Sequence, residues 1–154
     1  MTASETKKVD FEIEDLIKMI DNEEKKTKAI GSPKFTLAGV QFSIRVYPEK
    51  TANYIGVFVM NESNEDQTVS FAFKSPIPDT ELGPFNMQVI EKGWGWGSPD
   101  YMTHEEYKSW ANENGDVFKL EVTATLQIKE KPAVESTITL RGTESFSKFG
   151  TSLK

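Results

Sequence analysis

Residues 40–47 read Val-Gln-Phe-Ser-Ile-Arg-Val-Tyr, and this stretch decides the class of fold. Apolar side chains at Val40, Phe42, Ile44 and Val46 alternate with mostly polar ones. Successive side chains of a β-strand point to opposite faces of a sheet, so a period of two predicts a strand with one buried and one solvated face. An amphipathic helix would instead repeat its apolar residues every three or four positions.

The same period continues along the chain. It recurs in residues 54–60, 69–73 and 118–128, and residues 85–90 and 134–140 are typical of further strands. Thr103 and Glu106 have the spacing of a helix capping box, which predicts a short helix that ends by residues 114–115. The sequence therefore predicts an all-β fold, an antiparallel β-sandwich of seven to eight strands with one short helix.

The charge-rich first thirty residues allow two interpretations. Residues 9–13 alternate like a strand, whereas the apolar residues within 13–20 recur at helical spacing. One interpretation is a short strand to about residue 14, followed by a helix that ends near Ile30, before Gly-Ser-Pro at 31–33. The other is a single amphipathic helix.

Composition limits the classes of function. The chain has 154 residues, enough for one domain, and it contains no Cys, which excludes disulfides, thiolate metal sites and Cys nucleophiles. The net charge of −6 argues against nucleic acid as a partner, because phosphate recognition needs clustered Lys and Arg. The absence of Cys suits a reducing compartment.

The ends of the chain differ in composition from its centre. Residues 1–9 lack the apolar segment of an export signal, and no stretch has the length of a membrane span, so we expect a cytoplasmic or nuclear protein without a membrane partner. The expected organisation is a disordered N-terminus at 1–8, a domain at 9–128, an extra C-terminal strand or extension at 129–141 and a flexible tail at 142–154.

Four blocks of sequence carry a resemblance to a known family. Residues 32–48 contain Ser-Pro-x-Phe, then Gly-x-x-aromatic, then the alternating strand ending in Tyr-Pro, and this order resembles the opening of MATH (meprin and TRAF homology) domains. Residues 54–59, the run Gly-Trp-Gly-Trp-Gly at 93–97 and residues 104–122 are similar to later blocks of the same family. The resemblance covers roughly residues 9–128.

The chain departs from the family at three places. Phe11 and Phe42 stand where the family often has Trp, which is a conservative difference. The segment 97–100 is longer than the usual spacing after the Trp-Gly-aromatic signature, so we expect a reshaped rim beside it.

The resemblance implies a function. MATH domains, such as those of TRAF proteins and of BTB-type substrate adaptors of ubiquitin ligases, bind short extended peptides at a sheet edge in an aromatic groove. We therefore expect a non-enzymatic adaptor or substrate-recognition protein in ubiquitin-linked signalling, with short linear peptide motifs as partners and no cofactor. The positions that match the family's peptide site are Phe58, Phe71, Gln88, Trp94, Gly95 and Trp96.

The pattern of side chains around these positions bears on whether they could form a peptide site in this chain. In an extended strand Trp94 and Trp96 would share a face, and the intervening glycines would leave the other face bare for the approach of another backbone. Phe58 lies opposite the apolar face of its strand, which favours exposure. Phe71 lies on the same face of its strand as Val69 and Phe73, so a position in the core is as open an interpretation as a position in the peptide site.

The sequence gives little support to catalytic or metal-binding chemistry. His104 is the only histidine and lies beside two glutamates, which favours an exposed surface residue over a catalytic or zinc role. Residues 112–116 loosely resemble a calcium loop but lack its closing Glu, so no metal is assigned. Two rival functions remain: a carbohydrate-binding sandwich that stacks Trp94 and Trp96 on sugars, and a homo-oligomerising structural domain.

Overall fold

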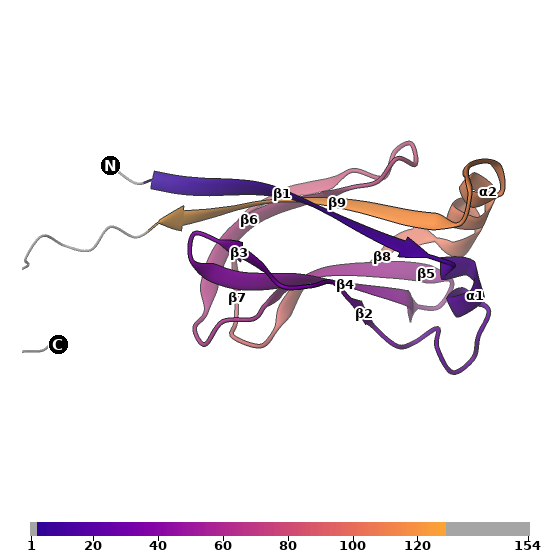
Figure 1. Cartoon of the computed structure of the whole chain (residues 1–154), viewed down its shortest axis with the longest axis horizontal. Helices are drawn as coiled ribbons and strands as arrows, with labels where there is room; N and C mark the ends of the chain where they lie inside the picture. Colours follow the sequence, from indigo (N-terminus) through magenta and orange to yellow (C-terminus); the bar gives the residue numbers. More distant parts are fainter. Residues whose placement is uncertain (1–2, 129–154) are drawn as a thin grey trace, which may run out of the picture. The chain divides into compact units, whose positions relative to one another are not determined.

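The computed structural model describes residues 3–128, of which residues 4–127 form one compact unit. This unit consists of two antiparallel sheets with a shared core, so the predicted β-sandwich is confirmed (Figure 1). The strand expected at 134–140, with the rest of the 129–141 extension and the tail at 142–154, lies outside the described residues.

Each sheet combines strands from distant parts of the chain. Sheet A has the order β1-β9-β6-β7, from β1 (Ala3–Glu14), β9 (Val117–Ile128), β6 (Gln67–Lys74) and β7 (Leu82–Ile90). Sheet B has the order β2-β4-β5-β8, from β2 (Ile30–Gly31), β4 (Val40–Thr51), β5 (Tyr54–Asn61) and β8 (Gly95–Thr103), with β3 (Phe35–Leu37) also paired to β4. The helices are α1 (Leu16–Ile20) and α2 (His104–Asn114).

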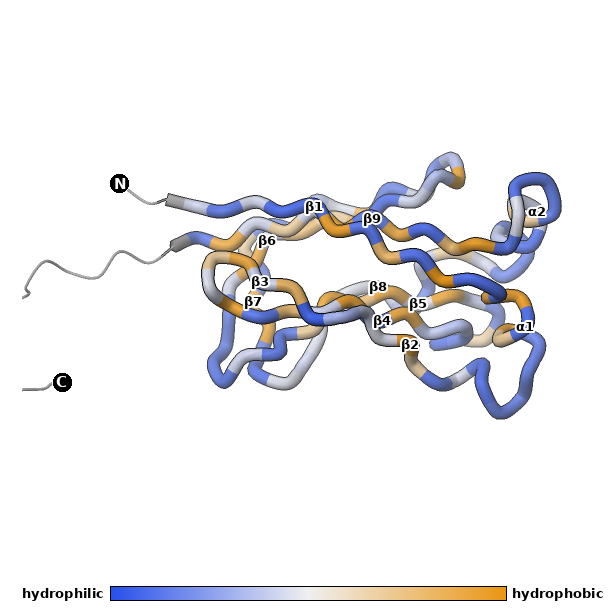
Figure 2. The backbone as a smooth tube through the Cα atoms, in the orientation of Figure 1, coloured by the Kyte–Doolittle hydropathy of each residue, from blue (hydrophilic) through white to orange (hydrophobic). Residues whose placement is uncertain are grey.

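The alternating apolar residues form the core between the sheets. Sheet A buries Ile13, Val69, Phe71, Phe73, Ile90, Phe118, Leu120, Val122, Ala124 and Leu126. Sheet B buries Leu37, Phe42, Ile44, Val46, Ile55, Val57, Val59 and Met102. Hydrophobic and hydrophilic segments alternate along the strands in Figure 2, as the period of two predicts.

Strand β1 is longer than expected. It begins at Ala3, so residues 4–8 are part of a strand and not a disordered end. Polar bonds hold this segment: the hydroxyls of Thr6 and Thr125 lie 2.8 Å apart, and the Lys7 ammonium donates to the Thr36 carbonyl at 2.6 Å. The strand also excludes the single amphipathic helix that residues 9–20 left open.

Helix α1 is shorter than expected and ends at Ile20, not near Ile30. The side-chain oxygen of Asn22 accepts hydrogen bonds from the backbone N–H groups of Glu24 and Lys25, at 2.9 and 3.1 Å. Such a local bond favours a turn over helix, and turns follow to residue 27.

The two predicted ends of elements had different outcomes. The capping box is confirmed: Thr103 Oγ1 accepts from the Glu106 N–H at 3.0 Å, and Glu106 Oε1 accepts from the Thr103 N–H at 2.9 Å. The strand expected to end at Tyr47-Pro48 instead continues to Thr51, through an irregularity between Tyr47 and Thr51. A proline is tolerated in a strand at such a bulge.

Candidate functional site

Strand β8 lies at the edge of sheet B, with β5 as its only neighbour in the sheet order. The Trp94 carbonyl accepts a hydrogen bond from the Asn61 N–H of β5 at 2.8 Å. The C=O and N–H of one trans peptide group point in opposite directions, so the N–H of Gly95 points away from β5. In an extended strand the backbone groups of Gly95 and Gly97 then face the free edge, where another strand could pair.

The regular part of this edge is short. Gly95 to Ser98 pair in register with Met60 to Val57, but the next pair is Ile55 with Met102, so β8 carries a bulge. The Ser98 hydroxyl donates to the Asp100 carboxylate at 3.0 Å within the bulge. The extra residues noticed in the sequence are therefore absorbed as a bulge that ends the regular pairing edge after Ser98.

A groove lies beside this edge on the solvent face of sheet B. We call it the outer groove; its volume is about 420 Å³, and it is lined by Arg45, Tyr47, Lys50, Phe58, Met60, Gly93, Trp94 and Gly95. The Tyr47 and Phe58 rings meet edge to face, with centroids 5.7 Å apart. Trp94 is the most exposed large apolar side chain of the described residues, at 67%.

Two cations lie in the outer groove. The Lys50 ammonium lies 4.5 Å from the centroid of the Tyr47 ring, and Arg45 Nη1 lies 3.5 Å from the Tyr47 hydroxyl. Neither cation has a carboxylate partner within ion-pair distance among the described residues. The outer groove therefore combines aromatic surface with positive charge, although the chain as a whole is acidic.

A second group of aromatic rings lies on the core side of β8. We call it the Trp96 cluster; it consists of Trp96, Phe71 and Phe85. The Trp96 ring centroid is 4.7 Å from that of Phe85 and 5.4 Å from that of Phe71. Trp96 and Phe85 are half-buried, so they form a partly accessible rim between the edges of the two sheets.

The structure divides the residues predicted from sequence into two groups. Phe58, Trp94 and Gly95 line the outer groove, and Trp96 lies on the other side of the strand. The expectation that Trp94 and Trp96 share a face is wrong, because Trp94 lies in the turn before β8, outside the alternation of the strand.

Phe71 and Gln88 do not line the outer groove. Phe71 is 2% exposed, so of its two open interpretations the core position is correct. Its ring packs against that of Trp96 from the core side. Gln88 lies on β7, where its side-chain amide donates to the Asn86 carbonyl at 3.0 Å. The β7 residue that packs on Trp96 is Phe85, which sequence reasoning missed.

The glycines serve the chain's own packing. A Cβ at Gly95 would collide with the Met60 sulfur, and a Cβ at Gly97 would collide with the Val57 carbonyl oxygen. The bare face expected to admit a foreign backbone is thus already occupied by β5 at these two positions. Glycine is needed there so that β8 can approach β5 closely.

Asn61 holds the turn that carries Trp94, and sequence reasoning missed it as well. Asn61 is 1% exposed, and its side-chain amide donates to the carbonyls of Glu65 and Ile90, both at 2.8 Å. Its backbone carbonyl accepts from the Gly93 N–H at 3.0 Å. The polar turn after Asn61 was visible in the sequence, but its bonds to residues some thirty positions away were not.

Two other hollows have no predicted role. One, of about 1140 Å³, is lined mostly by polar residues of α2, of the end of α1 with the turn that follows it, and of the turn between β4 and β5. It includes His104, which is half-buried and not exposed as expected, because its Nε2 lies 2.6 Å from the Pro48 carbonyl oxygen. Within residues 3–128 no group of His, Asp and Glu side chains is arranged to hold a metal ion.

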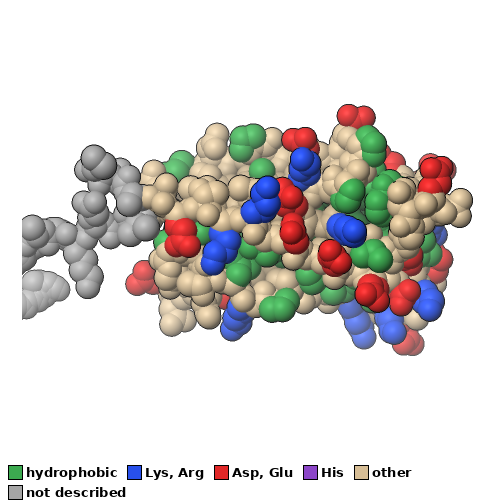
Figure 3. All heavy atoms as spheres, turned by 45° about the horizontal axis from the view of Figure 1, so that its top comes forward, with side chains coloured by type: hydrophobic (Ala, Val, Ile, Leu, Met, Phe, Trp, Pro, Cys, Tyr) green, Lys and Arg blue, Asp and Glu red, His purple; other side chains and the backbone are tan. Residues whose placement is uncertain are grey.

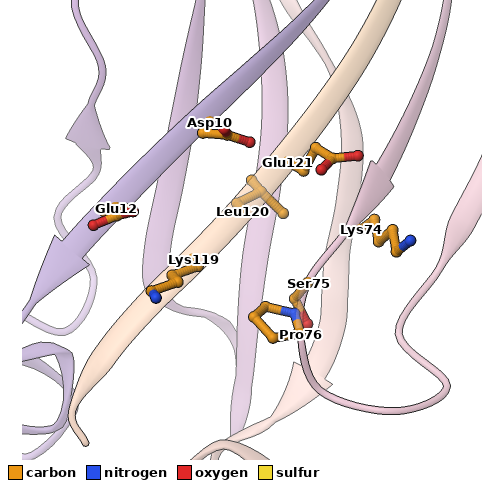
Figure 4. A pocket seen from close by; sticks show the side chains of 8 residues that line it. All are labelled: Asp10, Glu12, Lys74, Ser75, Pro76, Lys119, Leu120 and Glu121. Carbon is orange, nitrogen blue, oxygen red and sulfur yellow. The ribbon is translucent and has the colours of Figure 1, made fainter.

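The other hollow, of about 280 Å³, lies on the solvent face of sheet A. It is lined by Asp10, Glu12, Lys74, Ser75, Pro76, Lys119, Leu120 and Glu121, which come from β1, β9 and the end of β6 (Figure 4). On the face of the molecule seen in Figure 3, Lys and Arg side chains are interspersed with Asp and Glu side chains. The mixed charge of the hollow is typical of a solvated sheet face.

The sequence matches no protein-family model and no curated protein. Among the described residues, neither helix is long and apolar enough to cross a membrane. The chain is therefore placed by its fold, an antiparallel β-sandwich, and function is inferred from the geometry around the edge of β8.

Proposed function

We propose that this chain is a MATH-like, non-enzymatic module that binds short extended peptides by adding them as a strand to the edge of β8. The observation that carries the proposal is the free N–H of Gly95, directed away from β5 between two aromatic surfaces. Main-chain bonds at such an edge supply sequence-independent affinity, and flanking pockets supply specificity.

The two aromatic surfaces suit the alternation of a bound strand. Side chains of an extended peptide point alternately to its two sides, so successive residues would face the outer groove and the Trp96 cluster. The regular edge from Gly95 to Ser98 favours recognition of a short motif. Arg45 and Lys50 favour a peptide with an acidic residue on the side of the outer groove.

The wider role follows from the resemblance to MATH domains. Such a module would act as an adaptor or substrate-recognition protein in ubiquitin-linked signalling, in the cytoplasm or nucleus. Trp94 and Gly95 keep the family's signature positions and both line the outer groove, which supports this assignment.

A peptide library tests the proposal. The chain selects motifs from a degenerate library, and a labelled copy of the selected peptide is titrated by fluorescence anisotropy. Phe58→Ala and Trp94→Ala should each weaken binding by roughly 30-fold, the equivalent of about 2 kcal/mol for a buried anchor. Val89→Ala is the control, because Val89 is another exposed apolar side chain, lies on β7 outside the outer groove, and should leave affinity unchanged when truncated.

The carbohydrate-binding alternative has its own signature in the same experiment. It rests on the exposed ring of Trp94, since Trp96 is partly covered by Phe85. If no peptide is enriched and glycans quench the Trp94 fluorescence, the peptide proposal fails and the alternative replaces it. A Trp110→Phe background removes the tryptophan on α2, so that the signal comes from Trp94 and Trp96, and loss of the quenching in Trp94→Ala assigns it to Trp94.

A further inference from the structure

We propose that folding and N-glycosylation of this chain exclude each other at Asn61, so that the native protein forms only where no oligosaccharyltransferase meets the unfolded chain. Residues 61–63 read Asn-Glu-Ser and are the one match in the sequence to the acceptor pattern Asn-x-Ser/Thr. Such an acceptor normally lies in an exposed loop. Here the acceptor asparagine is the last residue of β5 and is only 1% exposed.

Both hydrogens of the Asn61 side-chain amide are engaged. The amide group has two N–H donors, and its nitrogen donates to the carbonyls of Glu65 and Ile90, each at 2.8 Å. The transferase would join this nitrogen to the anomeric carbon of a sugar, break the bond from that carbon to the pyrophosphate of a lipid-linked oligosaccharide, and release one amide proton. The product keeps a single N–H, so one of the two carbonyls must lose its donor.

The native fold has no space for a sugar at this nitrogen. The Ile90 residue that accepts one of the hydrogen bonds is itself 1% exposed, at the end of β7. A sugar on the Asn61 amide would separate β7 from β5 here and leave a buried carbonyl without a donor, which is destabilising. A glycan at Asn61 is therefore incompatible with the joint between the two sheets.

The hydroxyl of the acceptor sequence is also held inside the fold. The Ser63 hydroxyl and the Ser63 N–H both donate to Asn61 Oδ1, at 2.6 and 2.9 Å. The backbone N–H and carbonyl of Asn61 are bonded to Trp94 and Gly93. Opening residues 61–63 thus requires release of the turn that carries Trp94, and the transferase can reach Asn61 only in an unfolded chain.

The consequence is a restriction on where the protein can fold. A chain that meets the transferase before it folds is modified at Asn61 and cannot make the bonds that hold the Trp94 turn. A chain that folds first is protected by the same bonds. This restriction does not depend on peptide binding, because it follows from the contacts of Asn61 alone.

Cell-free translation with microsomal membranes tests whether the unfolded chain is an acceptor. The full chain with an added export signal enters the microsomes unfolded and should gain one glycan, seen as a shift in electrophoretic mobility. Ser63→Ala should show no shift, because it removes the hydroxyl of the acceptor sequence. A wild-type chain that enters the microsomes without a shift would overturn the proposal.

The effect of the glycan on folding is measured on a single sequence. The wild-type chain is translocated with and without an inhibitor of lipid-linked oligosaccharide synthesis, and is then digested with a protease after detergent opens the membranes. The unglycosylated chain should resist digestion, and the glycosylated chain should lose this resistance. Equal digestion of the two forms, whether fast or slow, would overturn the exclusion.

The protection of the native state is tested on the purified, folded Glu24→Thr variant, incubated with solubilised transferase and a lipid-linked oligosaccharide. This substitution adds a second acceptor sequence at Asn22, which is exposed in the turn after α1. Peptide mapping should find the glycan at Asn22 and not at Asn61, although both lie in the same molecule. Equal modification of the two asparagines in the folded protein would refute the proposal.

Discussion

The backbone N–H of Asn61 donates to the carbonyl of Trp94 at 2.8 Å, and this bond fixes the orientation of the peptide edge. The Asn61 carbonyl accepts from Gly93 in return. Its buried side chain ties the same point to the end of β7 through the Ile90 carbonyl. One residue thus sets the position of Trp94 relative to both sheets.

Asn61→Ala should lower the free energy of unfolding by about 1–3 kcal/mol, because the buried Ile90 carbonyl loses its donor. It should also weaken peptide binding, since the turn that carries Trp94 is less firmly held. Urea unfolding and peptide titration measure the two effects. Asn64→Ala, at an exposed position in the same loop, is the control, and equal behaviour of the two variants would contradict the role assigned to Asn61.

The two tryptophans of the signature should differ in their effect on stability. Trp94→Ala should reduce peptide binding and leave thermal unfolding nearly unchanged, because the ring is largely exposed. Trp96→Ala should reduce both, with a loss of roughly 2 kcal/mol or more of stability, because its ring packs on Phe71 and Phe85. Calorimetric unfolding measures the stability of both variants. A Trp96→Ala protein as stable as the wild type would show that the Trp96 cluster contributes no packing energy.

Gly97→Ala should destabilise the pairing of β8 with β5. A Cβ at this position collides with the Val57 carbonyl, so the strands must separate, at a cost of about 1–3 kcal/mol. Gly31→Ala is the matched control, because Gly31 also lies in a strand of sheet B but has no atom within 4 Å of the added Cβ. The stabilities of the two variants are compared by their denaturant unfolding midpoints. A Gly97→Ala protein as stable as Gly31→Ala would contradict the close approach of β8 to β5 at Gly97.

Tyr107 links α2 to the start of β9 and gives stability a dependence on pH. Its ring is fully buried, and its hydroxyl donates to Asp116 Oδ1 at 2.7 Å. Burial, followed by the hydrogen bond and the charge of Asp116, raises the pKa of the Tyr107 hydroxyl. The fold therefore favours the neutral hydroxyl, and its stabilising contribution is complete below the pKa of an unfolded tyrosine, about 10.

The free energy of unfolding of the wild type should fall as pH rises above about 10, because only the unfolded state then releases the Tyr107 proton. Tyr107→Phe should lose about 1–2 kcal/mol at neutral pH with its hydrogen bond, and should show a shallower decline at alkaline pH. Urea unfolding of both proteins between neutral and alkaline pH measures the difference. Parallel declines would show that Tyr107 does not contribute to the pH dependence.

Local patterns in the sequence were enough for most of the fold. The alternation at residues 40–47 predicts the buried face of β4, and the Thr103–Glu106 spacing predicts the start of α2, because each depends on neighbours in the chain. The extent of β1 could not be predicted, since residues 4–8 are polar and belong to a strand only through bonds to distant residues such as Thr125 and Thr36.

The candidate site was harder to predict. The resemblance points to the stretch around Trp94 and to Phe58, but it does not tell which side of the strand each ring occupies. That depends on where β8 begins, which the bonds of Asn61 decide. Phe85 was missed because its contact with Trp96 joins the edges of two different sheets.

The docking of a strand on β8 is tested most directly by amide hydrogen exchange, measured by NMR, with and without the selected peptide. The N–H groups of Gly95 and Gly97 should exchange more slowly when the peptide is bound, while that of Trp96, which faces β5, should change little. Unchanged exchange at both glycines under saturating peptide would contradict strand addition at this edge.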